Sequence, residues 1–167
     1  MRHSLILSAV CAGLSWPALS SSAAGQREAA VKPLGDAYYF NAAKTYGNHA
    51  ADHVHLLRQF APTSRLVPTG WVGQHLGAVR SNAASTGWAY SQLSPRVKDD
   101  PDGAEQLTEI QQQYAEALEI CDRLEAAFAA PVIDWALVSR NIDKLQSSLS
   151  GARATQQELA LEFGGDR

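Results

Sequence analysis

Hydrophobic side chains recur at steps of three and four residues in four long stretches of this chain. Such spacing places one apolar stripe along the face of an α-helix. The first stripe consists of Tyr39, Ala43, Tyr46, Ala50, His53, Leu57 and Phe60. No stretch alternates apolar and polar residues as a half-buried strand does. The pattern therefore predicts an all-α protein with helices at about 36–60, 70–93, 101–129 and 131–163.

Proline, glycine and capping residues separate these stretches. The breaks fall at Pro62 and Pro68, at Pro95, at Asp100-Pro101, at Pro131 and at Gly164-Gly165. Long helices with short connections favour an antiparallel up-down-up-down four-helix bundle, here spanning residues 36–165. The alternatives are a three-helix bundle whose second stretch is partly unwound, or a dimer built from long hairpins.

Three glycines weaken the prediction for the second helix. Gly73, Gly77 and Gly87 all lie inside it, and each costs about 1 kcal/mol relative to alanine in a helix interior. We expect them to mark the close approach of a neighbouring helix or an irregular first turn.

The start of the chain has the pattern of a cleaved signal peptide over residues 1–24. Arg2 and His3 precede an apolar run from Leu5 to Trp16, and small residues follow up to Ala24. A run of about 12 residues is too short to span a bilayer of roughly 30 Å, and no later stretch is apolar enough to do so. Residues 25–35 then form an N-terminal extension. We therefore expect an exported protein, periplasmic or secreted; the alternative is a buried N-terminal helix.

Composition narrows the class of protein and its partners. The 167 residues are 46% hydrophobic and 19% charged, with a formal net charge of -3 and two cysteines. These values exclude a disordered tail protein and a disulfide scaffold, and the acidic balance argues against nucleic acid as a partner. Residues 25–98 carry eight basic and three acidic side chains, whereas residues 99–167 carry five and fourteen. The two halves are expected to pair within one molecule or, alternatively, to guide pairing with another copy or a protein partner.

Candidate chemistry gathers at one end of the expected bundle. His49 and His53 are one helical turn apart, and His75 and Cys121 fall at a similar height along the bundle axis. Imidazole and thiolate groups that converge in this way bind zinc or copper, and bundles also hold haem between facing helices. The structural alternative is that His53 is a hydrogen-bonded layer residue and Cys121 a small buried hydrophobe.

Enzymatic patterns are weak in this sequence. It contains no Glu-x-x-His pair for a di-iron centre, no Cys-x-x-Cys-His haem attachment and no phosphate-binding glycine loop. A Cys121 nucleophile would need an exposed thiol of low pKa. The favoured hypothesis is an exported, non-enzymatic helical bundle that acts by binding or assembly. The alternative is a periplasmic metal- or haem-binding bundle that uses the histidine cluster.

Overall fold

The computed structural model describes residues 34–60 and 69–164. Across these two ranges the chain forms helices and no strands, which confirms the all-α prediction. The helices are α1 (Asp36–Phe60), α2 (Thr69–Ser91), α3 (Pro95–Lys98), α4 (Pro101–Ala129) and α5 (Trp135–Phe163). The expected signal peptide, and the extension apart from Leu34 and Gly35, lie outside the described residues.

Two of the predicted helices differ from the sequence prediction in their bounds. The last helix begins at Trp135 rather than at 131, because the Asp134 carboxylate caps it by accepting a hydrogen bond of 3.0 Å from the backbone N–H of Leu137. The second helix covers Thr69–Ser91 rather than 70–93, and the short helix α3 follows it, with Pro95 in its first turn. The pattern of apolar residues missed α3, since a single turn is too short to show a period.

The α2–α3 connection is bound to the start of α1. Both carboxylate oxygens of Asp36 accept hydrogen bonds from Ser94, one from its backbone N–H at 2.8 Å and one from its hydroxyl at 2.7 Å. Arg96 lies 3.7 Å from the same carboxylate. Asp36 is the first residue of α1, where an acidic side chain also interacts favourably with the helix dipole.

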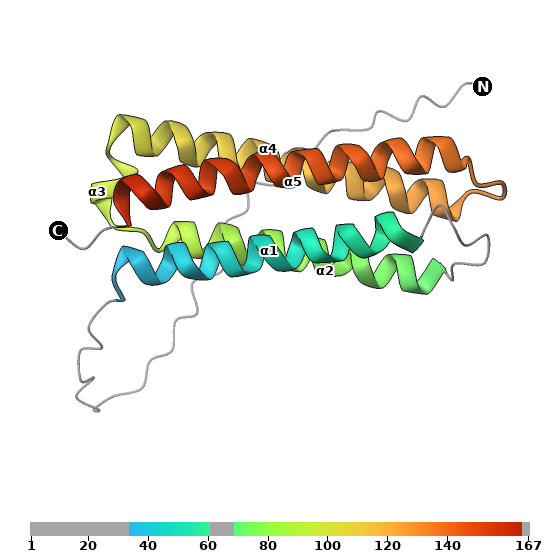
Figure 1. The fold of residues 1–167 in the computed structure, drawn as a ribbon, viewed down its shortest axis with the longest axis horizontal. Helices are drawn as coiled ribbons and strands as arrows, with labels where there is room; N and C mark the ends of the chain where they lie inside the picture. The colour runs from blue at the N-terminus through green and yellow to red at the C-terminus, as the bar shows by residue number, and fades with distance from the viewer. Residues whose placement is uncertain (1–33, 61–68, 165–167) are drawn as a thin grey trace, which may run out of the picture. The chain divides into compact units, whose positions relative to one another are not determined.

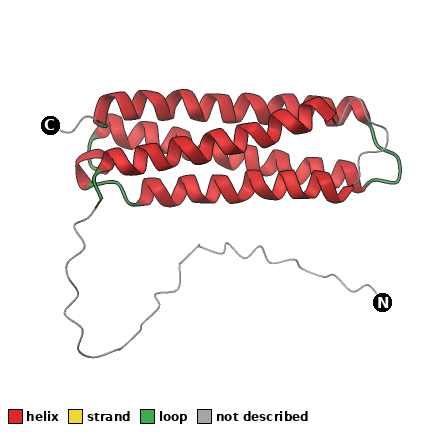
Figure 2. Cartoon of the chain, turned by 60° about the horizontal axis from the view of Figure 1, so that its bottom comes forward, coloured by secondary structure: helices red, strands yellow, loops and turns green. Residues whose placement is uncertain are grey.

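The four long helices pack side by side. α1 packs against α2 and α5, and α4 packs against α2 and α5. Figure 1 shows α1 beginning, α2 ending, α4 beginning and α5 ending at the end of the molecule where α3 lies. Figure 2, a view turned by 60°, shows the same lengthwise packing. None of the helices in the described ranges is both long enough and apolar enough to cross a membrane.

The apolar stripes meet in one core. Leu57 of α1, Leu76 of α2, Leu124 of α4 and Leu145 of α5 are all 0% exposed. Burial of a leucine side chain contributes about 1.5–3 kcal/mol. Because each helix turns its leucine side toward this shared core, its rotation about its own axis is fixed. That rotation decides which of its other side chains face each neighbouring helix.

A polar layer crosses this core with one polar side chain each from α2, α4 and α5. Gln156 of α5 donates a hydrogen bond of 3.0 Å to the Tyr114 hydroxyl of α4, which also pairs with the Thr86 side chain of α2. Gly47 of α1 leaves the space for them, because a methyl group there would lie 2.9 Å from Gln156 Oε1 and 3.0 Å from Tyr114 Oη. Burial raises the pKa of Tyr114, although both hydrogen bonds oppose that shift.

The glycines that were expected to mark close helix contacts do not do so. A side-chain carbon added at Gly73, Gly77 or Gly87 would meet nothing within 4 Å, so that prediction is wrong. The close approaches occur instead at Gly47 and at Gly103, where the Val97 carbonyl of α3 occupies the space a side chain would need. Glycine content alone does not reveal which side of a helix faces a neighbour.

Candidate functional site

His53 on α1 and His75 on α2 face each other between these helices. Their Nδ1 atoms lie 2.8 Å apart, the length of a hydrogen bond in which one imidazole donates its N–H and the other accepts. The ring centroids are 5.1 Å apart. Both side chains are partly exposed, so the pair can be reached from solvent.

Trp71, one turn before His75 on α2, packs against the histidine pair. Its ring lies 4.2 Å from the His75 ring, centroid to centroid, at an interplanar angle of 57°. The two residues are four positions apart and therefore share one face of the helix. Burial, and secondarily the charge of His53, lower the pKa of His75 below its ordinary value of 6.5. The neutral imidazole, which is the form that binds metals, is favoured as a result.

The other two residues predicted as metal ligands do not join the pair. His49, one turn before His53, is exposed on α1. Cys121 is 0% exposed and belongs to the hydrophobic core, where burial raises the pKa of its thiol to about 11. Across residues 34–60 and 69–164, no three His, Cys, Asp or Glu side chains gather so that they could hold a metal ion. The structure thus brings together two of the four predicted ligands.

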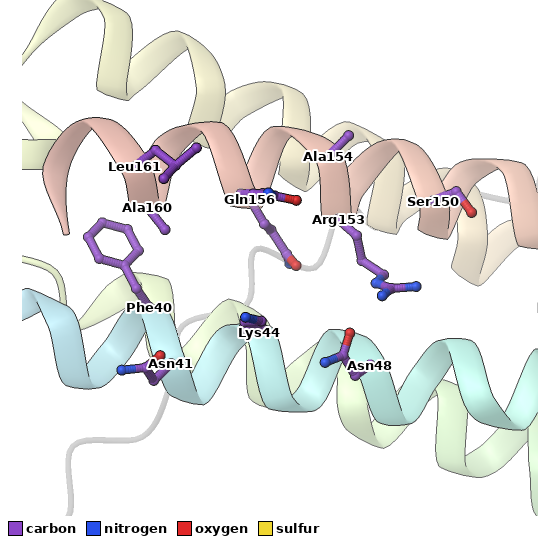
Figure 3. A pocket seen from close by; sticks show the side chains of 11 residues that line it. Phe40, Asn41, Lys44, Asn48, Ser150, Arg153, Ala154, Gln156, Ala160 and Leu161 are labelled. Atoms are coloured by element: carbon purple, nitrogen blue, oxygen red, sulfur yellow. The ribbon is translucent and has the colours of Figure 1, made fainter.

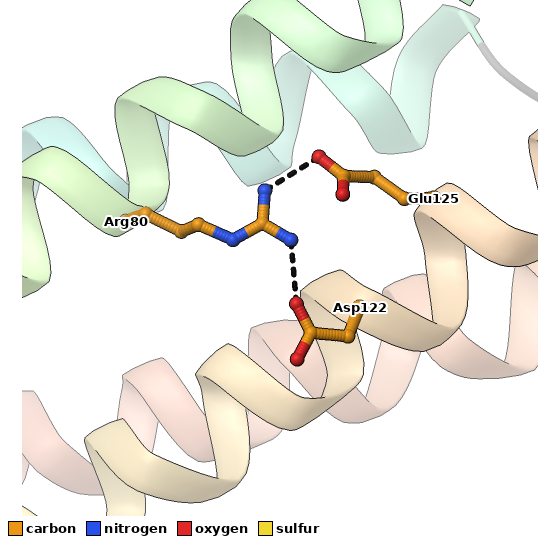
Figure 4. A network of polar contacts seen from close by, with 3 residues as sticks. All are labelled: Arg80, Asp122 and Glu125. Carbon is orange, nitrogen blue, oxygen red and sulfur yellow. Dashed lines mark hydrogen bonds and ion pairs between the residues drawn. The ribbon is translucent and has the colours of Figure 1, made fainter. Parts of the chain in front are cut away.

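Ion pairs join the basic front half of the chain to its acidic back half. Arg80 of α2 reaches two carboxylates of α4, with Nη1 2.5 Å from Glu125 Oε1 and Nη2 2.7 Å from Asp122 Oδ1 (Figure 4). These hydrogen bonds raise the pKa of Arg80. Arg58 of α1 lies 3.4 Å from Asp143 of α5. Part of the charge asymmetry is therefore used to hold helices together within one molecule.

A second site, which the sequence did not indicate, lies between α1 and α5. It is a groove of about 530 Å³ in which Lys44 and Arg153 are the charged lining residues (Figure 3). Gln156 of the polar layer also lines it. The sequence signal for this groove is that Lys44 and Arg153 each lie next to an apolar position of their own helix. Only the packing of α1 against α5 shows that they share a groove.

Comparisons with known proteins identify no relative: no family model, no curated protein sequence and no solved structure matches this chain.

Proposed function

We propose that this chain is an exported, non-enzymatic helical-bundle protein that acts by binding, and that it binds a transition-metal ion through His53 and His75. The observation that carries the metal-binding proposal is the 2.8 Å separation of the two Nδ1 atoms. Imidazole nitrogen is a preferred ligand of zinc, copper and nickel. Two such groups on neighbouring helices form a bidentate site.

The two imidazoles need only a small movement to hold a metal. A tetrahedral zinc ion with Zn–N bonds of about 2.0–2.1 Å requires nitrogen atoms about 3.3 Å apart. The observed separation of 2.8 Å is about half an ångström shorter, so the nitrogens must move apart by that amount and both rings must turn so that their lone pairs point at the ion. Water or an incoming ligand would fill the other positions. A haem would need its flat macrocycle between the two axial imidazoles, and this separation leaves no room for one.

The buried thiol favours binding over catalysis. A cysteine nucleophile requires an accessible thiolate, but Cys121 is 0% exposed and its pKa is raised to about 11. At neutral pH the thiol is therefore protonated and enclosed. Cys121 then serves as a small apolar residue of α4 in the hydrophobic core. The partly exposed pair of His53 and His75 supplies the ligands for the metal ion.

Metal titration of the tag-free protein tests this proposal. Calorimetric titration with Zn²⁺ and with Cu²⁺ should give one site per chain, and His53→Ala or His75→Ala should each weaken binding at least about tenfold. His49→Ala and His55→Ala are the matched controls, since both residues are exposed histidines of α1, and should bind as the parent does. Equal losses in all four variants, or no saturable site in the parent, would rule out the pair as a metal site.

The overall organisation is part of the same proposal. We infer an up-down-up-down four-helix bundle, supported by the packing of α1 on α2 and α5 and of α4 on α2 and α5. The export signal is supported by the basic start, the apolar run and the small residues of positions 1–24. N-terminal sequencing of the exported product should begin at Ala24 or Gly25. A product that keeps Met1 would contradict export by cleavage.

Assembly with another copy of the chain is a second candidate, favoured by an aromatic cluster on α1 and α2. Tyr38 and Trp88 are 49% and 42% exposed, and Tyr39 contacts both rings at centroid distances of 5.3 and 6.0 Å. Aromatic residues are enriched at protein interfaces. Sedimentation equilibrium should then show a dimer that Trp88→Gln dissociates, and a parent that is monomeric at all concentrations would reject this candidate.

A further inference from the structure

The groove between α1 and α5 has the size of a small-molecule site. Its volume of about 530 Å³ falls within the 300–1,000 Å³ of ordinary ligand pockets. α1 contributes residues one turn apart on one face, namely Phe40, Lys44 and Asn48, together with Asn41. The opposite wall is a stretch of α5 from Ser150 to Leu161.

The groove changes in polarity along its length. Because α1 and α5 run in opposite directions, Phe40 lies across from Ala160 and Leu161 at one end (Figure 3). Asn48 lies across from Ser150 and Arg153 at the other end. Residues 40–48 of α1 span about 12 Å. The Phe40 end, which Asn41 also lines, is therefore the more apolar of the two, over roughly the length of a medium-chain molecule.

The charge of the groove is positive and unbalanced. Neither Lys44 nor Arg153 forms an ion pair with an acidic side chain in the described ranges, and no Asp or Glu lines the groove. Arg58 and Arg80, by contrast, each pair with carboxylates of a neighbouring helix. The two groove cations are therefore available to an anion from outside the chain.

The floor of the groove is rigid because it belongs to the buried polar layer. Gln156 is 6% exposed, and its amide is held by the Tyr114 hydroxyl at 3.0 Å. Gly47 keeps this position free of a competing side chain. A site whose polar groups are already held in place loses less conformational entropy when its ligand binds.

We propose that this groove binds a small amphipathic anion, with its apolar chain between Phe40 and Leu161 and its carboxylate between Lys44 and Arg153. The arrangement also accounts for Leu161, which is 78% exposed and would be partly covered by an apolar chain. The groove is separate from the proposed metal site, because the histidine pair lies between α1 and α2.

A headgroup series tests the proposal while the chain length stays constant. Calorimetry with decanoate, decanol and decylamine, below their aggregation concentrations and with EDTA present, separates charge from apolar contact. Decanoate should bind about tenfold more tightly than decanol, because a charge-assisted hydrogen bond is stronger than a neutral one. Decylamine should bind more weakly than both. Equal affinities for the three compounds, or no binding of decanoate, would overturn the proposal.

Single variants then locate the bound molecule. Arg153→Gln and Lys44→Gln should each lower decanoate affinity several-fold and leave decanol affinity unchanged, whereas Leu161→Gln should weaken both ligands. Lys144→Gln is the matched control, because it removes an exposed cation of α5 that does not line the groove. If Lys144→Gln reduced decanoate binding as much as Arg153→Gln did, the effect would be one of net charge and the proposed position would be wrong.

Discussion

His53 Nδ1 and His75 Nδ1 lie 2.8 Å apart, the length of a hydrogen bond that links α1 to α2. The two residues are 22 positions apart in the chain, and the segment 61–68 between their helices lies outside the described residues. A hydrogen bond between two imidazoles requires one of the facing nitrogens to be unprotonated. A pair in which both facing nitrogens carry a proton cannot form this bond, so we expect the contact between these helices to weaken at low pH.

The metal-free protein should lose stability as the pH falls below about 6.5. The pKa of His75 is lowered in the folded chain by burial and by His53, so the unfolded chain takes up the proton first, near the ordinary value of 6.5. The contribution of the neutral His75 side chain is complete above that value and declines as the pH falls towards its folded pKa. Urea unfolding in EDTA across this range measures the effect.

His75→Gln is the control for this pH dependence. It removes the titrating group, so its free energy of unfolding should change less between neutral and mildly acidic pH than that of the parent. Loss of the hydrogen bond itself should cost about 0.5–1.5 kcal/mol at neutral pH. An unchanged pH profile in His75→Gln would contradict the assignment of the titration to His75.

Two glycine-to-alanine substitutions should change stability in opposite directions. The methyl group added in Gly77→Ala would have no neighbouring atom within 4 Å. This substitution should stabilise the protein by about 0.5–1 kcal/mol, because alanine has a higher helix propensity than glycine. Gly47→Ala places a methyl group 2.9 Å from Gln156 Oε1 and 3.0 Å from Tyr114 Oη, and should destabilise by about 1–3 kcal/mol. Thermal or urea unfolding of both variants makes the comparison.

A double variant identifies the cause of the loss at Gly47. In Gly47→Ala/Tyr114→Phe the hydroxyl that faces the new methyl group is absent, so the combined cost should be smaller than the two single costs added together. Additive costs would mean that the methyl group and the Tyr114 hydroxyl do not interact, and would leave Gln156 Oε1, at 2.9 Å, as the group that limits position 47.

Arg80→Gln should weaken the α2–α4 contact measurably. Arg80 is partly buried, with a side-chain exposure of 29%, and bridges two carboxylates, so its loss should cost about 1–2 kcal/mol and less at high salt. Arg123→Gln is the control, because Arg123 lies 3.8 Å from Glu119 in an exposed pair within α4. That substitution should change stability by less than about 0.5 kcal/mol. Equal costs at the two positions would argue against a clamp between the helices.

Cys121 should resist alkylation in the native protein. Its thiol is 0% exposed and burial raises its pKa to about 11, so the reactive thiolate is scarce at neutral pH and becomes more abundant only as the pH approaches that value. Iodoacetamide labelling, located by peptide mass spectrometry, should be slow in buffer and fast in denaturant. Labelling at the same rate in both solvents would show that the thiol is not enclosed.

The histidine pair shows how far a candidate site can be predicted from sequence. A rise of about 1.5 Å per residue gives the height of a residue along its helix, and it placed His53 and His75 at similar levels. The same count placed Cys121 and His49 there, but height does not give the direction in which a side chain points. Rotation of each helix about its axis turns Cys121 into the core and leaves His49 exposed.

The sequence by itself determined the helical class, because the apolar spacing and the prolines are local properties of the chain. It also determined the capping of α4 by Asp100, whose carboxylate accepts hydrogen bonds from the N–H groups of Asp102 and Gly103. Only the tertiary structure decided that Lys44 and Arg153 share a groove and that Gly47 makes room for Gln156. Residues more than 100 positions apart meet through the packing of whole helix faces, and that packing minimises a free energy summed over the entire core.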